Sequence, residues 1–252
     1  MSAERLGIDV GGSSIKLARV AVGDGTVIGE LATVPMPAPS TPERVLEAAM
    51  RHPLAAATEG PVGLAFPAVI KQGRARTAAH VDPSWLGVDA AALVAQGWGR
   101  RCEFLNDADA AGLAEMRFGA GRGLGGVVLV LTLGTGIGSA PFVDGRLLPN
   151  TELGHLVLPG IAAIDAEEHA SARTRTRLAL AWPAWTARVD AVLAELHRLF
   201  WPDAFILGGA VSERFDEWGP LLHAPCPVRP AALGSRAGAV GAAVAAAERY
   251  NP

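Results

Sequence analysis

Cysteine, lysine and long apolar runs are all scarce in this chain of 252 residues. Cys102 and Cys226 are the only cysteines and neither belongs to a Cys-x-x-Cys pair, so a disulfide framework or a cysteine-bound zinc site has little support. No uncharged stretch of about 20 apolar residues occurs, so no membrane span is expected. The chain opens without a basic segment followed by a long apolar run, and no signal peptide is expected. We therefore expect a soluble cytoplasmic protein.

Positive charge is also limited. Lys16 and Lys71 are the only lysines among 22 basic residues, and the net charge is −3. General nucleic-acid binding would need a strongly basic face, so it is not expected. Half of the residues are apolar, which is typical of a packed globular protein and not of a disordered chain. The length is compatible with one domain or two.

Two short stretches, 6–14 and 131–139, share one pattern. Each has apolar strand-like residues, then a turn of glycine and hydroxyl residues, then a second apolar run. Glycine can adopt a positive φ and lets backbone N–H groups approach a ligand closely. Successive N–H groups in such a turn form a concavity that binds anions. One such turn in each half of the chain predicts a phosphate chain held between two lobes.

The apolar periodicity predicts alternating strands and helices. Strands are expected over 6–10, 15–22, 27–34, 61–66, 102–105, 127–133, 137–143, 146–148 and 204–207. Helices are expected from Pro42, over 89–97, 108–118, 183–200 and 235–249, and from about Val211. Asp-Gly turns break both sets of opening strands, as in β-hairpins. The repeat implies two similar α/β lobes with a ligand in the cleft between them. We place a small N-terminal lobe at 1–105 and a large lobe at 106–234, and expect the helix at about 235–250 to pack back on the first lobe.

Five motifs then occur in a fixed order. They are Gly7-Ile-Asp-Val-Gly-Gly-Ser13, Asn106-Asp-Ala-Asp109, Leu133-Gly-Thr-Gly-Ile-Gly138, Glu152-Leu-Gly-His155 and Gly208-Gly-Ala-Val-Ser212. Together they resemble the ROK family of bacterial sugar kinases. Its polyphosphate glucokinase branch is resembled further at Phe66-Pro67, Arg76-Thr-Ala-Ala79, Val81-Asp82, Ser84-Trp85 and 150–155. The resemblance covers nearly the whole chain.

The resemblance implies a fold and an activity. The fold is α/β, the two-lobe actin-like (ribonuclease H-like) sugar kinase fold with a central cleft. The activity is phosphoryl transfer from polyphosphate, with ATP as a further donor, to the 6-hydroxyl of glucose. A strictly ATP-dependent glucokinase, a kinase for a related hexose and a non-catalytic sugar-binding protein stay open as alternatives. Relatives are commonly homodimers, and no nucleic-acid or membrane partner is expected.

Asp107 follows Asn106 directly, where a strand is expected to end and a helix to begin. Transfer of a phosphoryl group to a sugar hydroxyl needs a carboxylate that orients the hydroxyl and accepts its proton. The resemblance places the catalytic aspartate at position 107. The alternative is that the Asn-Asp pair only caps the helix.

Sugar recognition is expected from carboxylate, amide and imidazole groups, which accept or donate hydrogen bonds to hydroxyls. The resemblance assigns this role to Asn106, Glu152, His155, Glu167 and His80. Glu168 is an alternative to Glu167, and both could be acids of a first helical turn. Relatives usually carry Asn where this chain has His80, so strict glucose preference is left open. Many ROK proteins carry a cysteine-rich zinc site after His155, but 156–200 contains no cysteine, so no structural zinc is expected.

The resemblance also implies sites for the donor. Phosphate contacts are expected from Gly11, Gly12, Ser13, Lys16, Gly134, Thr135 and Gly136. Asp9 is expected to hold Mg²⁺ through water, with an ion pair to Lys16 as the alternative. Nucleotide contacts are expected at Gly208 and Gly209, before a helix start that favours anions, although Ala210 replaces a usual third glycine. Arg173, Arg175 and Arg177 form a candidate polyphosphate track or a solvated face.

Other classes fit poorly. A dinucleotide-binding dehydrogenase needs Gly-x-Gly-x-x-Gly after the first strand, and the third glycine is missing. A P-loop ATPase needs Gly-Lys-Ser/Thr, and neither lysine follows a glycine. Sugar-responsive repressors of the same fold carry a DNA-binding domain before the kinase region, and none is expected here because the first glycine turn lies within about a dozen residues of Met1.

Overall fold

The computed structural model describes residues 4–78, 81–160 and 164–250, and the chain divides into two compact units. The first unit comprises Met1–Ala114 with Arg236–Pro252, and the second comprises Glu115–Ser235. The change of unit falls inside α4 (Asp107–Phe118), later than the sequence-based boundary near Leu105. None of the helices in these described ranges is both long and apolar enough to cross a membrane.

The first unit contains a six-stranded sheet in the order β3-β2-β1-β5-β8, with β4 also paired to β2. Its strands are β1 (Glu4–Val10), β2 (Ser14–Ala21), β3 (Thr26–Val27), β4 (Ala32–Pro35), β5 (Val62–Phe66) and β8 (Cys102–Asn106). β1, β5 and β8 are parallel, so their carboxyl ends lie at one edge of the sheet. The single strand expected over 27–34 is wrong: β3 and β4 are separate, and Gly29 between them has a φ of 80°.

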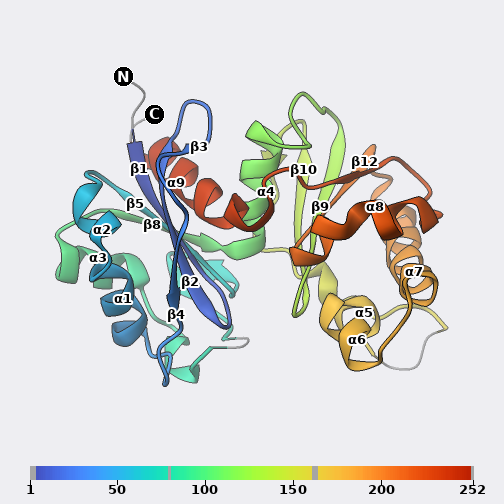
Figure 1. Ribbon diagram of the computed structural model, residues 1–252, viewed down its shortest axis with the longest axis horizontal. Helices are drawn as coiled ribbons and strands as arrows, with labels where there is room; N and C mark the ends of the chain where they lie inside the picture. The colour runs from blue at the N-terminus through green and yellow to red at the C-terminus, as the bar shows by residue number, and fades with distance from the viewer. Residues whose placement is uncertain (1–3, 79–80, 161–163, 251–252) are drawn as a thin grey trace. The chain divides into compact units, whose positions relative to one another are not determined.

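Helices cover both faces of this sheet. Figure 1 shows α1 (Pro42–Met50), α2 (Pro53–Ala57) and α3 (Ala90–Trp98) on one side and α9 (Ala237–Tyr250) on the other. A Cβ atom on Gly7, Gly63 or Gly241 would overlap the carbonyl oxygen of Ala239, Ala242 or Ala110. The glycines therefore let α9 lie directly against the backbone of β1, β5 and α4.

The segment between β5 and α3, where the sequence predicts neither a strand nor a helix, contains three short elements. These are β6 (Ile70–Lys71), β7 (Arg74–Ala75) and the 3₁₀ turn η1 (Pro83–Trp85). Trp85 is fully buried, with its ring centroid 4.1 Å from that of Phe66, and its Nε1 donates a hydrogen bond to the carbonyl of Ser40. Two residues of the resemblance, Phe66 and Trp85, are thus part of the core.

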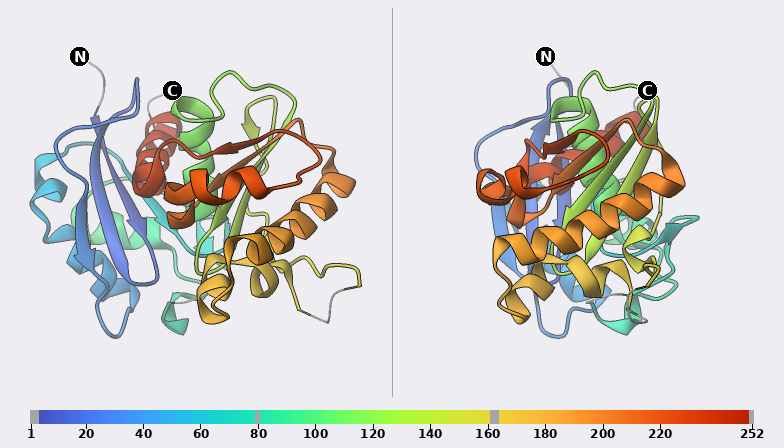
Figure 2. Two further views of the ribbon diagram at one scale, coloured as in Figure 1. Left: turned by 45° about the vertical axis from the view of Figure 1, so that its right-hand side comes forward. Right: turned by 90° about the vertical axis from the view of Figure 1, so that its right-hand side faces the viewer.

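The second unit has a five-stranded sheet in the order β11-β10-β9-β12-β13. Its strands are β9 (Val127–Leu133), β10 (Ile137–Val143), β11 (Arg146–Leu147), β12 (Ala204–Gly208) and β13 (Val228–Pro230). β9, β12 and β13 are parallel. Figure 2 shows α7 (Trp182–Phe200), the long orange helix, beside this sheet, and its apolar face joins a core with Trp185 and Trp218.

The two sheets open in the same way. β1 and β2 are antiparallel, as are β9 and β10, and each second strand pairs with a short third one. Asp144 and Gly145 both have positive φ, 47° and 74°, as the two-residue hairpin turn requires. The prediction of a repeated strand opening is confirmed, and with it an α/β fold.

Candidate functional site

In the first unit, polar residues gather where parallel strands end. Asp9 is paired with Ala65 of β5, and Asn106, the last residue of β8, is paired with Phe66 of β5. Asp107 follows as the first residue of α4. Ligands of open α/β sheets bind outside the carboxyl ends of the strands, so this edge is the candidate site of the first unit.

The surroundings of Asp9 disfavour the ionised form of its carboxylate. Burial, and then repulsion by the Asp107 carboxylate, raises the pKa of Asp9 to about 6, although Lys16 acts in the opposite direction. The Nζ of Lys16 lies 3.9 Å from Oδ2 of Asp9, so the expected ion pair is long. A Cβ on Gly238, in the first turn of α9, would lie 2.6 Å from the carboxyl carbon of Asp9. Gly238 therefore makes room for this carboxylate, which the sequence alone did not indicate.

Asn106 is buried, and its side-chain amide makes hydrogen bonds to two backbone groups. Its Nδ2 donates to the carbonyl of Ala68 (3.1 Å), and its Oδ1 accepts from the N–H of Asp109 (3.0 Å). Asn106 thus caps α4 and ties the segment after β5 to the end of β8. An amide has two donors and two lone pairs, so each atom keeps capacity for a further bond.

Asp107 is half-buried at the start of α4. Its Oδ1 accepts a hydrogen bond from the N–H of Ala108 (2.8 Å). Asn106 supplies the bond that caps α4 and Asp107 accepts from another N–H of its first turn, so this geometry is compatible with both the capping and the catalytic interpretation of Asp107. The electrostatic coupling to Asp9 places two carboxylates near each other at this sheet edge.

The first glycine turn joins β1 to β2. The N–H of Gly11 donates to the carbonyl of Ser14 (2.9 Å), and Gly12 and Ser13 are exposed. Although glycine can adopt a positive φ, these turns do not use that freedom. Gly11, Gly12, Gly134 and Gly136 all have ordinary φ values.

At the second glycine turn, the absence of a Cβ on Gly136 leaves room for the carboxylate of Glu167. Oε2 of Glu167 accepts a hydrogen bond from the N–H of Ile137 (3.1 Å), and a Cβ on Gly136 would overlap this carboxylate. The N–H of Arg173 donates to the carbonyl of Gly134 (3.1 Å). Glu168 is exposed on the next position of α5 (Ala166–Ala170), so Glu167 is the glutamate that reaches the turn.

His155 ends the 3₁₀ turn η2 (Leu153–His155), and its Nδ1 lies 2.8 Å from Oδ2 of Asp165. The hydrogen bond to Asp165 raises the pKa of His155, and the charges of Glu167 and Glu152 add to the effect. His155 therefore contacts Asp165 directly and is close enough to Glu167 and Glu152 for their charges to act on it. Asp165 was not selected from the sequence, although an Asp three residues before a Glu is a helix-start signal.

The segment that carries Glu152 and His155 is fixed to β10. Oγ of Ser139 donates to the carbonyl of Thr151 (2.8 Å) and accepts from the N–H of Leu153 (3.0 Å). A Cβ on Gly154 would overlap the carbonyl of Ile137. Glu152 itself is exposed.

The segment after β12 differs from the expectation. An α-helix from about Val211 is wrong, because Ala210–Arg214 form a 3₁₀ turn, η3, followed by the four-residue α8 (Phe215–Trp218). The helix-dipole argument for a nucleotide site therefore loses its support. Gly208 pairs with Thr132 of β9, and a Cβ on Gly209, whose φ is 87°, would overlap the carbonyl of Leu133. Both glycine turns of this unit thus follow neighbouring parallel strands.

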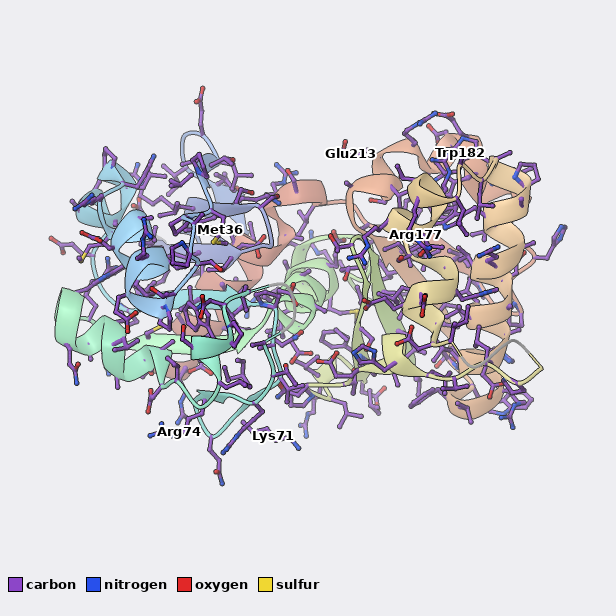
Figure 3. All side chains as sticks on the ribbon, turned by 90° about the horizontal axis from the view of Figure 1, so that it is seen from below. Met36, Lys71, Arg74, Arg177, Trp182 and Glu213 are labelled. Carbon is purple, nitrogen blue, oxygen red and sulfur yellow. The ribbon has the colours of Figure 1, made fainter. Side chains whose placement is uncertain are left out.

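The three arginines of the candidate track lie in different settings. Arg173 and Arg177 are exposed at the two ends of α6 (Ala172–Arg177). Arg175 instead packs its guanidinium 3.4 Å from the ring centroid of Trp182. Figure 3 shows Arg177 and Trp182 on the neighbouring helices α6 and α7.

Two expectations concern groups that the structure does not place. His80 lies outside the described residues. In the described part of the chain, no group of three or more His, Cys, Asp or Glu side chains is arranged to hold a metal ion. Cys102 and Cys226 are both free thiols.

The fold and the two sheet-edge sites define an actin-like α/β protein with paired glycine turns. A sequence model of the ROK family matches residues 5–174. The chain belongs to the ROK family.

Individual relatives agree with this placement. The polyphosphate glucokinase of Mycobacterium tuberculosis is 45% identical over 240 residues, which cover 95% of this chain and 89% of that protein. The crystal structure of an inorganic polyphosphate/ATP-glucomannokinase from Arthrobacter sp. strain KM matches with a TM-score of 0.91 and 45% identity, over 98% of this chain and 100% of that one. A ROK family glucokinase from Streptomyces griseus, solved with glucose and AMPPNP, has a TM-score of 0.81 and 25% identity over 98% and 100% of the two chains.

Proposed function

We propose that this protein transfers a phosphoryl group from inorganic polyphosphate, and also from ATP, to the 6-hydroxyl of glucose. The observation that carries the proposal is the 45% identity to a polyphosphate glucokinase over 95% of the chain. The glucomannokinase at the same identity supports both donors and makes mannose a second acceptor to test.

In this proposal Asp107 is the general base. It orients the 6-hydroxyl and accepts its proton as the hydroxyl oxygen forms a bond to the terminal phosphorus of the donor. The bond from that phosphorus to the bridging oxygen breaks, and the electron pair leaves with the shortened polyphosphate or with ADP. Base catalysis of this kind contributes about 10²- to 10⁴-fold in rate.

The Asp9–Asp107 pair also fits a divalent cation. The carboxylates of Asp9 and Asp107 repel each other, and Nζ of Lys16 lies 3.9 Å from Asp9, so a divalent cation bound near Asp9 would relieve this repulsion. We propose that Asp9 holds Mg²⁺ through water, as Mg²⁺ prefers. The ion would neutralise charge on the phosphates of the donor.

We assign sugar contacts to Glu152, His155 and Glu167, with Asn106 and His80 as further contacts. The hydrogen bond from the N–H of Ile137 to Glu167, and the effect of the Glu167 and Glu152 charges on His155, support this assignment. Carboxylates accept hydrogen bonds from sugar hydroxyls, and a site with such groups discriminates against analogues that lack a hydroxyl.

We assign the donor to the glycine turns. Backbone N–H groups of Gly11, Gly12, Ser13, Gly134, Thr135 and Gly136, with Lys16, would bind its phosphates. Gly208 and Gly209 would lie at the nucleotide when ATP is the donor. Arg173 and Arg177 are exposed and suited to a longer polyphosphate chain. Arg175 is occupied by its packing on Trp182, so we give it a supporting role.

The test is a product assay. The purified protein is incubated with glucose and Mg²⁺ and with polyphosphate or ATP separately, and glucose 6-phosphate is quantified. We expect product with polyphosphate, and also with ATP. Product with ATP alone would favour the strictly ATP-dependent alternative. Glucose-induced thermal stabilisation without product from either donor would favour a non-catalytic sugar-binding protein.

A further inference from the structure

Asp165 holds two parts of the second unit together through one carboxylate. Its Oδ2 lies 2.8 Å from Nδ1 of His155, and its Oδ1 accepts a hydrogen bond from the N–H of Glu168 (2.8 Å), which caps α5. The backbone reinforces this arrangement. Val157 and Asp165 form an antiparallel bridge, and the N–H of Ala166 donates to the carbonyl of Leu156 (2.8 Å). The backbone pairing of these two segments therefore holds the side chains of His155 and Asp165 close together.

This contact decides which nitrogen of His155 carries a proton. An ionised carboxylate only accepts hydrogen bonds, so Nδ1 of His155 must be the donor. In the neutral imidazole, Nε2 is then an acceptor. The His155 side chain is 61% exposed, so the rest of the ring is accessible to a ligand.

We propose that Asp165 is a positioning residue for sugar recognition: it keeps the proton on Nδ1 of His155, so that Nε2 accepts a hydrogen bond from a sugar hydroxyl. This inference rests on the proposed function, because it takes the sugar as the ligand of His155. It adds a residue and a direction to that contact. The sugar hydroxyl donates a hydrogen bond to Nε2, while the Asp165 carboxylate accepts one from Nδ1 of the same neutral imidazole.

The same carboxylate orients Glu167 indirectly, since it caps the helix on which Glu167 lies. A test must therefore separate the cap from the contact with His155. Two variants do this. Asp165→Asn keeps a good N-cap, but its amide NH₂ would donate to Nδ1 of His155 and so favour a proton on Nε2. Asp165→Ser also keeps a good N-cap, but its side chain is too short to hold the imidazole.

Asp89→Asn is a matched control in the first unit. Oδ1 of Asp89 accepts from the N–H of Ala92 (2.9 Å) at the start of α3, and its Oδ2 lies 3.7 Å from Arg74. The substitution thus alters a capping aspartate that also contacts a second side chain, far along the chain from His155.

For Asp165→Asn we expect the KM for glucose to rise about 3- to 10-fold, the range for loss of a hydrogen bond between neutral groups, while kcat changes less than about 3-fold. Asp165→Ser should raise this KM less, because the His155 imidazole of that variant can still adopt either tautomer. Asp89→Asn should leave both constants unchanged. Equal KM values for Asp165→Asn and the unaltered protein would overturn the inference.

The pH profile gives a second readout. Asp165, Glu167 and Glu152 are the charged groups that raise the pKa of His155. In both Asp165 variants the inflection of 1/KM for glucose that reports His155 should move to lower pH, because the largest of these effects is lost. An inflection that stays in place would contradict the inference.

The tautomer can be observed without any substrate. ¹⁵N-detected NMR of the six histidines, with the His155 signals assigned by their loss in His155→Gln, should show the proton on Nδ1 in the unaltered protein and on Nε2 in Asp165→Asn. An unchanged tautomer would refute the inference whatever the kinetics. If the tautomer changes but the unaltered protein phosphorylates no glucose, the proposed function fails and the role of Asp165 in setting the His155 proton stands.

Discussion

At the scale of single residues, the environment of Asp9 opposes the negative charge of its carboxylate. Its carboxylate is largely buried, faces Asp107 and has only a long contact with Lys16. A buried ionised carboxylate of this kind lowers the free energy of unfolding. Its presence is explained when a bound ligand interacts with its charge.

We therefore expect Asp9→Asn to stabilise the protein in Mg²⁺-free buffer. Folding raises the pKa of Asp9 from 3.8 to about 6, so the folded state binds the proton more tightly and the ionised group opposes folding above about pH 6. The gain should be about 2–3 kcal/mol at pH 7.5 and should vanish below about pH 4, where the carboxyl is protonated in both states. Urea unfolding at both pH values measures it.

Asp24→Asn is the control for this substitution. The Asp24 carboxylate accepts a hydrogen bond from the N–H of Thr26, which lowers its pKa, so no gain is expected. A loss of stability in Asp9→Asn at pH 7.5 would show that the ionised carboxylate contributes to folding.

At the scale of elements, the contact of α9 with α4 depends on one glycine. A Cβ on Gly241 of α9 would overlap the carbonyl of Ala110 of α4. Both atoms belong to helical backbone, so neither can shift without its helix. Gly241→Ala should lower the melting temperature by about 6–12 °C, as expected for overpacking that costs about 3 kcal/mol.

Gly97→Ala provides the opposite case in α3. Nothing lies within 4 Å of a Cβ at Gly97, so alanine gains helix propensity without a clash. A rise in melting temperature of about 1–3 °C is expected. If calorimetry found the two variants equally stable, the close packing of α9 would not limit stability.

The elements also show what sequence patterns can predict. The openings β1–β2 and β9–β10 and the long helix α7 have strong periodicity and clear turn residues, and they were predicted. β3 and β4 were expected as one strand and β13 was not expected, because two to four residues are too few to show a period. The two-residue β11 was predicted because the Asp144-Gly145 turn precedes it.

Part of the candidate site was also predictable, because some of its residues follow strands with a clear sequence pattern. Asp9, Asn106 and Asp107 sit next to recognisable strand ends, so the sequence indicates their neighbourhood. The room that Gly238 leaves for Asp9, and the Asp165 partner of His155, depend on contacts between elements that no local pattern encodes. The 3₁₀ turn at η3 was mistaken for an α-helix because its four-residue continuation, α8, supplies the apolar spacing.

At the scale of the whole molecule, an acidic protein with net charge −3 is proposed to bind a polyanion. Local positive charge must then outweigh the overall repulsion. Arg173 and Arg177, exposed on α6, are the residues that we assign to this task.

The double variant Arg173→Ala/Arg177→Ala should raise the KM for long-chain polyphosphate about 3- to 10-fold, which corresponds to two exposed ion pairs, and should weaken its salt dependence. The KM for ATP and kcat should not change. Arg198→Ala, which removes an exposed arginine paired with Glu195 on α7, is the control. An equal effect on both donors would argue against a separate polyphosphate track.

The central claim is that Asp107 accepts the proton of the sugar hydroxyl during phosphoryl transfer. The most direct measurement compares Asp107→Asn with the unaltered protein in kcat, with polyphosphate as donor, and in the dissociation constant for glucose. We predict that kcat falls at least about 100-fold while the dissociation constant changes less than about 3-fold. A variant that retained more than about a tenth of kcat would contradict the account.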